Sequence, residues 1–321
     1  MRVSRAALRV VKSHLIREYN MRVLDAASAF QPDMLLAFKG TYVTANTLRK
    51  IRARGIALYN YYPDRMVFAC GTLLEDSIPE YDCVFDTKRL WDGDTGKRIS
   101  VRNLVFIPHG YDSEIHHPVQ VNEGDNRQYG CEVGVVATHM PVKEQVLDQL
   151  LQVRPRLGLN IWGGQWGEYC RSERVKNCVR GTALTGIAYT KAILCMQVNL
   201  GLMGVDHNAK DETSTRTYEI PACGGFMLHE RSKEVLELYQ EGREVACFES
   251  VQELAEKIDY YLAHREEREA IARAGHARCV PAYSYDNRVA EILRWHQQVR
   301  GTIRDAGRPE LGASQVATPT R

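Results

Sequence analysis

Short apolar runs alternate with stretches of helical periodicity along most of the chain. In the first third, MLLAF at 34–38 and NLVFIP at 103–108 lie on either side of a helical pattern at 44–54. Apolar runs of this length are typical of parallel strands that helices cover on both faces. The pattern therefore predicts an α/β fold built from doubly wound parallel sheets. The strands predicted in this first series lie at 34–38, 56–62, 82–85 and 103–108.

A second series of the same kind follows a polar, turn-rich segment, VQVNEGDNRQYG at 119–130. We expect this segment to link two lobes, an amino-terminal one over 1–118 and a carboxyl-terminal one over 131–300. The tail at 301–321 lacks periodicity, and we expect it to be disordered. The second series predicts strands at 132–137, 159–163, 198–203, 226–230 and 246–248, and helices at 142–153, 188–196, 214–223, 232–240, 251–263, 265–276 and 285–300.

The amino-terminal lobe is short at its front, because its first strand is predicted only at Met34. We expect that either one or two opening strands of this lobe are missing or the true start of the chain lies upstream. Residues 1–22 carry six Arg or Lys side chains against Glu18 alone, with apolar side chains interleaved at helical spacing. Such a basic amphipathic helix can touch an anionic membrane surface, and the alternative is a helix whose basic face is simply solvated.

Composition limits the class of protein further. The chain has 321 residues, of which 44% are hydrophobic, enough for two domains with separate cores. The net charge is +2, so no nucleic-acid partner is indicated. Nine cysteines without CxxC spacing indicate buried thiols in a reducing compartment. The chain has no apolar run of about 18 residues and no signal-peptide core, so we expect a cytoplasmic protein.

The densest candidate chemistry lies in DETSTRTYEIPACGGFMLHE, residues 211–230. Thr213, Ser214 and Thr215 can each cap a helix that starts here. The first amides of that helix lack partners within it, and the positive end of its dipole favours phosphate. This stretch therefore predicts an anion-binding helix start.

Two charged residues follow on the same predicted helix. Arg216 and Glu219 are three positions apart, so they share a face with Thr215. A guanidinium can neutralise pyrophosphate, and a carboxylate can accept hydrogen bonds from two ribose hydroxyls. The alternative is an ordinary capped helix with an ion pair on its surface.

The order of several segments resembles a known family. RTYEIPACGGFML, ELAEKIDYYLAHREEREAIARAGHARC and YSYDNRVAEIL resemble the carboxyl lobe of glycosyltransferases with the GT-B fold, in particular the CgeB-like branch. FQPDMLLAFKG, LYNYYPD, FIPHGYD, EVGVVATHMP and NIWGGQW agree, so the resemblance covers about residues 20–298. It implies two Rossmann-like lobes facing a cleft, with a nucleoside-diphosphate sugar on the carboxyl lobe and an acceptor on the amino lobe.

The resemblance also implies roles for single residues. Glu219 matches the glutamate that holds the nucleotide ribose. Asp211, with seven residues between it and Glu219, stands where relatives carry a longer glutamate near the donor sugar, and Glu212 is the alternative. Lys143 and Arg216, together with amides of the helix start, are expected to take the charge of the phosphates.

Further candidates lie at turns and strand ends. Gly163 and Gly164 let the backbone approach the nucleotide base, with Trp166 available to stack on it, and a turn with a core tryptophan is the alternative. Asp64 and His109 end strands of the amino lobe, and each is a candidate base for the acceptor hydroxyl. The alternative for His109 is a hydrogen-bonded structural histidine.

The hypothesis from the sequence is glycosyl transfer from a nucleotide sugar to a glycan or protein acceptor, in cell-surface polysaccharide or glycoconjugate synthesis. We expect neither a cofactor nor a metal ion, since Asp92-Gly-Asp94 lies in the turn composition WDGDTG. A non-catalytic GT-B protein that binds a sugar nucleotide is the alternative function. A nicotinamide oxidoreductase is disfavoured, because no G-x-G-x-x-G follows an early strand.

Overall fold

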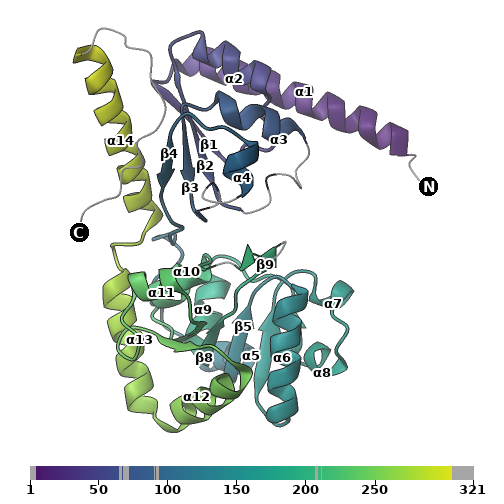
Figure 1. Ribbon diagram of the computed structural model, residues 1–321. Coiled ribbons are helices and arrows are strands. Elements are labelled where there is room, and N and C mark those ends of the chain that lie inside the picture. Colours follow the sequence, from purple (N-terminus) through teal and green to yellow (C-terminus); the bar gives the residue numbers. More distant parts are fainter. Residues whose placement is uncertain are drawn as a thin grey trace. The chain divides into compact units, whose positions relative to one another are not determined.

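The structure, a computed structural model, divides into two compact units (Figure 1). Unit 1 comprises Met1–Pro108 and the end of the chain from Thr302, and unit 2 comprises His109–Gly301. The structure describes residues 5–64, 67, 72–89, 91, 94–206, 209–210 and 212–305.

Unit 1 contains a four-stranded parallel sheet whose strands neighbour one another in sequence order. The first strand begins at Met34, as predicted. Helix α2 starts where the Thr44 hydroxyl accepts from the amide of Thr47, and it buries Leu48 and Ile51 against the sheet. The elements are α1 (Arg5–Phe30), β1 (Met34–Phe38), α2 (Ala45–Arg52), β2 (Ala57–Tyr62), α3 (Thr72–Ser77), η2 (Ile78–Glu80), β3 (Cys83–Asp86), α4 (Asp94–Arg98) and β4 (Leu104–Phe106).

Unit 2 contains a six-stranded parallel sheet in the order β12-β11-β8-β5-β6-β7. Its strands are β5 (Cys131–Val136), β6 (Leu159–Trp162), β7 (Val179–Gly181), β8 (Met196–Gly201), β11 (Met227–Glu230) and β12 (Ala246–Phe248). The chain runs outward from β5 to β7, returns to place β8 beside β5, and runs outward again on the other side. This reversal matters because open α/β sheets bind ligands at the carboxyl ends of the strands where the order reverses.

Helices cover both faces of this sheet, as a doubly wound fold requires. Val133 and Val135 of β5 belong to one apolar cluster, which includes residues of α6 and α12, whereas Val136 belongs to another, which includes residues of α9 and α10. The helices are α5 (Glu123–Tyr129), α6 (Pro141–Val153), α7 (Trp166–Tyr169), α8 (Glu173–Lys176), α9 (Ile187–Cys195), α10 (Arg216–Cys223), α11 (Lys233–Leu238), α12 (Val251–Ala263), α13 (Arg265–Cys279) and α14 (Tyr285–Asp305); β9 (Val205–Asp206) and β10 (Ala209–Lys210) form a small antiparallel pair.

The segment expected to be a linker is part of unit 2 instead. Residues 119–130 contain α5, which begins with a capping box in which Asn122 and Asp125 exchange hydrogen bonds of 3.0 Å. Asp125 also pairs with Lys191 of α9 at 3.0 Å. The polar sequence did not predict this helix, because α5 is held more by its caps and ion pair than by an apolar face. The division between the units falls earlier, after Pro108.

The end of the chain differs from the prediction as well. Helix α14 continues to Asp305, beyond the predicted end at Arg300. The rest of the expected tail, 306–321, lies outside the described residues. Eight of the nine cysteines lie within the described residues, and all eight are free thiols.

Candidate functional site

A cavity of about 340 Å³ lies in unit 2 at the carboxyl ends of β5, β6 and β7. Ala137 and Thr138 line it from the turn after β5, and Gly163 from the turn after β6. The loop at 183–186 contributes another wall, and α10 presents Arg216 and Glu219. The cavity therefore lies beside β5, where the strand order reverses, which is the position that the topology favours for a ligand.

Helix α10 holds its two charged residues in place through an unusual set of contacts. Pro221 lies inside the helix and has no amide hydrogen, so the carbonyl of Thr217 lacks its helical partner. The hydroxyl of Tyr239 donates to that carbonyl at 2.9 Å instead. Gly224 ends the helix with a φ of 85°, a conformation that favours glycine. The first turn of α10 is therefore rigidly positioned at the cavity.

Two side chains of the cavity carry buried polar atoms that lack partners. Within the described part of the chain, no group hydrogen-bonds to Arg216 Nε or to the hydroxyl of Tyr189. Native structures leave few buried polar atoms unpaired, and a polar ligand in the cavity supplies the missing partners. Burial, followed by the nearby Glu219 carboxylate, raises the pKa of Tyr189 well above its ordinary value, so the phenol stays protonated and can donate.

His116 is a further cavity residue that sequence reasoning missed. The amide of Asp112 donates to its Nδ1 at 3.1 Å, so in the neutral ring the hydrogen is on Nε2. Its ring packs edge-on against Tyr189 at a centroid distance of 5.3 Å. Burial lowers the pKa of His116 below its ordinary value, so the ring is neutral near pH 7. The sequence indicated His109 as a candidate base, whereas the histidine that lines the cavity is His116.

The turn after β6 depends on one glycine. Gly163 has a φ of 154°, and a Cβ added there would lie 1.9 Å from the carbonyl oxygen of Ala137. Gly164 has no atom within 4 Å of the equivalent position. Only the first of these two glycines is therefore required for the close approach of the turns that follow β5 and β6.

We expect Gly163→Ala to lower the free energy of unfolding by about 2–5 kcal/mol, because the backbone is strained and the carbonyl of Ala137 must move. Gly164→Ala is the matched control, with an expected change within about 1 kcal/mol. Urea unfolding of both variants measures the difference. Equal stability of the two variants would show that Gly163 does not fix this turn.

Of the residues predicted to bind the donor, Arg216 and Glu219 line the cavity, and their roles stay predictions. Lys143 is buried on α6, and its Nζ donates to the carbonyl of Thr138, a cavity residue, at 3.3 Å. Gly164 does not line the cavity; its carbonyl accepts from the amide of His139 at 2.9 Å.

Trp166 is not placed to stack on a nucleotide base. Its side chain is fully buried in the apolar core of unit 2. Its indole Nε1 donates to the carbonyl of Ala137 at 2.6 Å. The ring therefore closes the turn after β5 from inside, which corresponds to the alternative of a core tryptophan.

The residues before α10 do not act as the predicted caps. Thr215 occupies the N-cap position but makes no side-chain cap bond. The hydroxyl of Thr217 accepts from the amide of Ser214 at 3.0 Å, so one of the amides expected to meet phosphate is already used. Thr213 is fully buried and donates to Glu234 at 3.0 Å. The helix start is thus tied to unit 2 by bonds that the local sequence does not reveal.

Two of the three predicted catalytic residues, Asp64 and His109, do not line this cavity. Asp64 lies in unit 1 at the end of β2, and its half-exposed carboxylate pairs with Lys39. His109 is buried at the start of unit 2, where its carbonyl accepts from Arg288 Nε at 3.2 Å. Asp211 lies outside the described residues.

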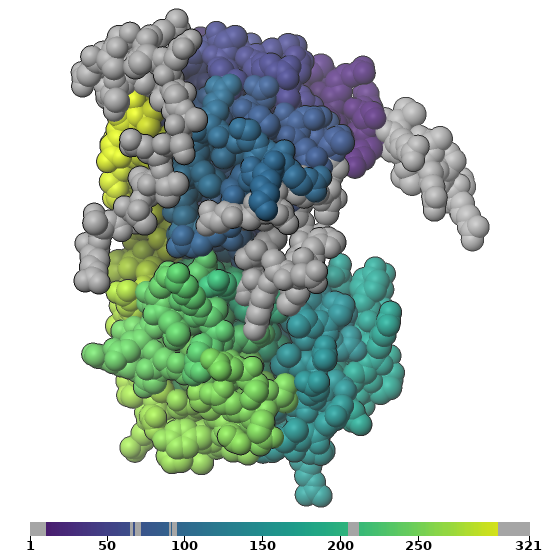
Figure 2. Space-filling view, in the orientation of Figure 1, coloured from purple at the N-terminus to yellow at the C-terminus, as the bar shows by residue number. Residues whose placement is uncertain are grey.

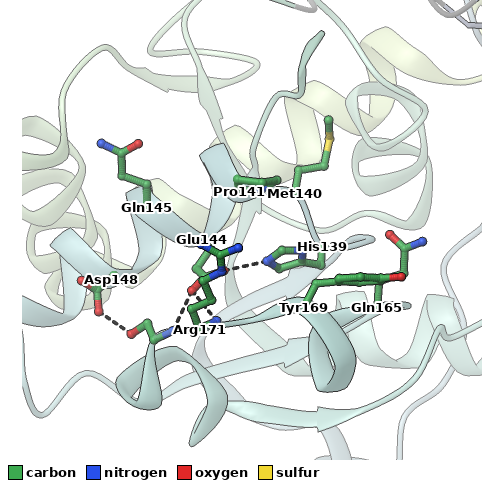
Figure 3. Close-up of a pocket in the computed structure, with 10 residues that line it drawn as sticks. His139, Met140, Pro141, Glu144, Gln145, Asp148, Gln165, Tyr169 and Arg171 are labelled. Atoms are coloured by element: carbon green, nitrogen blue, oxygen red, sulfur yellow. Dashed lines mark hydrogen bonds and ion pairs between the residues drawn. The ribbon is translucent and has the colours of Figure 1, made fainter. Parts of the chain in front are cut away.

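A larger cavity of about 650 Å³ lies between α6 and α7, and Figure 3 shows its lining. Glu144 accepts there from His139 and from the amides of Arg171 and Ser172, each at 2.7 Å. Burial raises the pKa of Glu144, but these hydrogen bonds outweigh it, so the pKa lies below its ordinary value. Asp148 is likewise bonded to the hydroxyl of Ser172. Because its acidic groups already have partners, we place the candidate site in the smaller cavity.

Two general features hold for the described residues. None of the helices there is both long and apolar enough to cross a bilayer. Within the same part of the chain, no three or more His, Cys, Asp or Glu side chains are grouped so that they could hold a metal ion.

Solved structures of similar architecture identify the fold. The chain is similar to sucrose-phosphate synthase of Thermosynechococcus elongatus, with a TM-score of 0.62 and 10% identity over 94% of this chain and 81% of that one. It is also similar to Alr3699/HepE of Anabaena, solved in complex with UDP, with a TM-score of 0.63 and 13% identity over 87% of this chain and 82% of that one. The α/β fold with two parallel sheets is therefore the GT-B fold, as predicted.

Sequence comparisons relate the chain to glycosyltransferases in particular. Residues 141–294 match a family model described as glycosyl transferase-like. The chain is 21% identical over 284 residues to spore protein CgeB of Bacillus subtilis (strain 168), which covers 84% of each protein. These findings confirm the resemblance to CgeB-like glycosyltransferases with the GT-B fold.

Proposed function

We propose that the chain transfers a sugar from a nucleoside-diphosphate sugar to an acceptor hydroxyl, with the donor held in the 340 Å³ cavity of unit 2. The observation that carries this proposal is the pair Arg216 and Glu219 at the strand-order reversal, with Arg216 Nε buried and unpaired among the described groups. The solved complexes of Alr3699/HepE with UDP and with UDP-glucose, in a similar fold, support it.

In this proposal, each charged group meets the part of the donor that complements it. The carboxylate of Glu219 accepts from the ribose hydroxyls, and the guanidinium of Arg216 binds the diphosphate. Lys143, buried behind Thr138, adds positive charge to the same wall. Bond breaking leads in an oxocarbenium-like transition state, so these cations act mainly by stabilising the diphosphate of the leaving nucleoside diphosphate, without a metal ion.

The acceptor in this proposal is a glycan or glycosylated protein of the cell surface. Asp64 and His109 are the candidate bases for its hydroxyl if the reaction inverts the anomeric centre. A retaining reaction, in which Asp211 faces the donor sugar, needs no dedicated base.

A panel of nucleotide sugars tests the proposed function. We expect a UDP- or GDP-sugar to raise the melting temperature of the full chain, whereas NAD leaves it unchanged. Release of the nucleoside diphosphate from the stabilising donor, measured by a coupled assay, then separates a transferase from a non-catalytic binding protein. Stabilisation by NAD alone, or by no nucleotide sugar, would contradict the proposal.

We also propose that α1 attaches the protein peripherally to an anionic membrane on the cytoplasmic side. Val11, Leu15 and Tyr19 are spaced four residues apart and are 54%, 56% and 47% exposed. The described part of α1 lies at the surface, purple in Figure 2. Lys12 is exposed next to this apolar stripe, and Arg17 is exposed on the opposite side of the helix. Apolar insertion and attraction to anionic lipid act together in such a helix.

Vesicle sedimentation tests this membrane proposal. We expect binding to vesicles of phosphatidylcholine with phosphatidylserine and little binding to phosphatidylcholine alone. Because each basic residue contributes about 1 kcal/mol, Lys12→Glu with Arg17→Glu should reduce binding about tenfold or more. The melting temperature of this variant controls for folding. Equal binding to both kinds of vesicle would refute the anionic preference.

A further inference from the structure

We infer that the hydroxyl of Tyr189 donates a hydrogen bond to the ribose 2′-hydroxyl of the donor and makes the site select ribonucleotides over deoxyribonucleotides. This inference rests on the proposed function and deepens it, because it limits the donor to ribonucleoside-diphosphate sugars. It arises from three observations in unit 2: an unpaired buried hydroxyl, a rigidly held ring and a neighbouring carboxylate.

The hydroxyl of Tyr189 is the first observation. The side chain lines the cavity and is only 6% exposed. Its oxygen makes no hydrogen bond of good geometry to a described group, and the charged group that acts on it most strongly is the Glu219 carboxylate. A buried hydroxyl without a partner costs free energy, so a ligand that provides one gains affinity at this atom.

The ring of Tyr189 is held in place on several sides. The amide of Tyr189 donates to the carbonyl of Gly186 at 3.1 Å, which closes the first turn of α9. The neighbouring hydroxyl of Thr190 donates to the carbonyl of Ile115 at 2.7 Å, and the ring of His116 packs edge-on against the phenol. The hydroxyl therefore cannot turn away to find another partner without breaking these contacts.

The carboxylate of Glu219 lines the same cavity and interacts electrostatically with Tyr189. A carboxylate only accepts hydrogen bonds, so it can take the protons of two ribose hydroxyls but cannot serve their oxygen lone pairs. A protonated phenol beside it can donate to one of those oxygens. Glu219 and Tyr189 together thus complement a ribose diol as acceptor and donor.

Removing the hydroxyl from the ligand reverses this gain. A deoxyribose leaves the phenol of Tyr189 and part of the carboxylate of Glu219 buried without partners. Sites built to hydrogen-bond a hydroxyl reject analogues that lack it more strongly than apolar pockets reject a missing methylene. The class of donor follows, because dTDP-sugars contain deoxyribose and UDP- and GDP-sugars contain ribose.

Titration calorimetry of the full chain tests the inference, with UDP and GDP and the 2′-deoxy and 3′-deoxy forms of each as probes. We expect Tyr189→Phe to weaken binding of the preferred ribonucleotide about three- to tenfold. The same variant should leave the affinity of the 2′-deoxy form unchanged within about twofold, since the hydroxyl that Tyr189 contacts is already absent there, and should weaken the 3′-deoxy form as it weakens the ribonucleotide.

Two controls separate a binding role from a structural one. Tyr169→Phe removes a hydroxyl from a half-exposed tyrosine in the larger cavity, and we expect it to change no affinity. The melting temperature of unliganded Tyr189→Phe should equal or exceed that of the wild type, because the lost hydroxyl has no partner in the free protein.

The contradicting results are distinct. A Tyr189→Phe variant that weakens the 2′-deoxy form as much as UDP or GDP, or that weakens none of the probes, would overturn the inference while leaving the proposed function intact. A wild-type chain that binds neither UDP nor GDP would overturn both.

Discussion

Arg216→Met should slow turnover of the donor by about 10²- to 10³-fold, the largest effect that we expect from one side chain. The guanidinium borders the cavity, and its Nε has no partner among the described groups. Its charge matters most when the bond between the sugar and the leaving nucleoside diphosphate breaks, so kcat should fall more than KM rises. Arg216→Lys keeps the charge but loses the planar fork, and we expect an intermediate rate. Steady-state release of the nucleoside diphosphate measures all of these.

Arg273→Met is the matched control for this prediction. Arg273 is 71% exposed on α13 and makes a surface contact of 4.0 Å with Glu269. Its loss should leave the rate within about twofold of the wild type, since exposed ion pairs contribute little. If Arg216→Met and Arg273→Met turn over the donor equally fast, Arg216 does not stabilise the leaving group.

Glu219→Gln should weaken binding of the nucleoside diphosphate about 10²-fold. The substitution keeps the shape of the side chain but replaces one acceptor oxygen with a donor, so one ribose hydroxyl loses its charge-assisted bond and meets a donor. Each hydrogen bond to a charged group contributes about 1.5–3 kcal/mol, which corresponds to this loss. Calorimetry with the diphosphate and, separately, with inorganic pyrophosphate measures the effect.

Only the nucleoside diphosphate should show the change, because pyrophosphate lacks a ribose. Glu168→Gln, an exposed glutamate on α7 outside both cavities, should bind like the wild type. If Glu219→Gln binds the nucleoside diphosphate as tightly as the wild type, the ribose does not bind this carboxylate. A similar loss with pyrophosphate would indicate a general electrostatic or structural effect instead.

The sequence predicts the sheets of this protein better than their connections. Parallel strands are buried on both faces, so they are encoded as apolar runs, and MLLAF at 34–38 matches β1 residue for residue. Helix α5 was not predicted from the sequence. It is held by a capping box between Asn122 and Asp125 and by an ion pair to Lys191. When only hydrophobic periodicity is considered, a helix held by polar contacts of this kind is predicted as a loop.

The candidate site was predictable only where its residues lie close together in the chain. Arg216 and Glu219 are one helical turn apart, so local spacing places them on one face. Tyr189 and His116 meet only through the fold, where the bond from Thr190 to Ile115 joins positions 75 residues apart. Trp166 shows that local sequence can also mislead. A tryptophan after a Gly-Gly turn gives the same sequence pattern whether it lies in a core or in a binding site.

Cavity size does not identify the candidate site in unit 2, where other cavities, of about 650 and 680 Å³, are larger. The cavity of about 650 Å³ is lined by acidic groups that already accept hydrogen bonds, such as Glu144. The cavity of about 340 Å³ contains buried donors without partners among the described groups, Arg216 Nε and the hydroxyl of Tyr189. Unsatisfied polar atoms lower their free energy when a complementary ligand binds, whereas satisfied ones gain little. This difference favours the smaller cavity.

A structure of the chain with a bound nucleoside diphosphate tests the central claim most directly. We predict the ribose within hydrogen-bond distance of the Glu219 carboxylate and the Tyr189 hydroxyl, with the diphosphate against Arg216. A nucleotide lodged between His139 and Tyr169 in the larger cavity, or bound only to unit 1, would contradict the account.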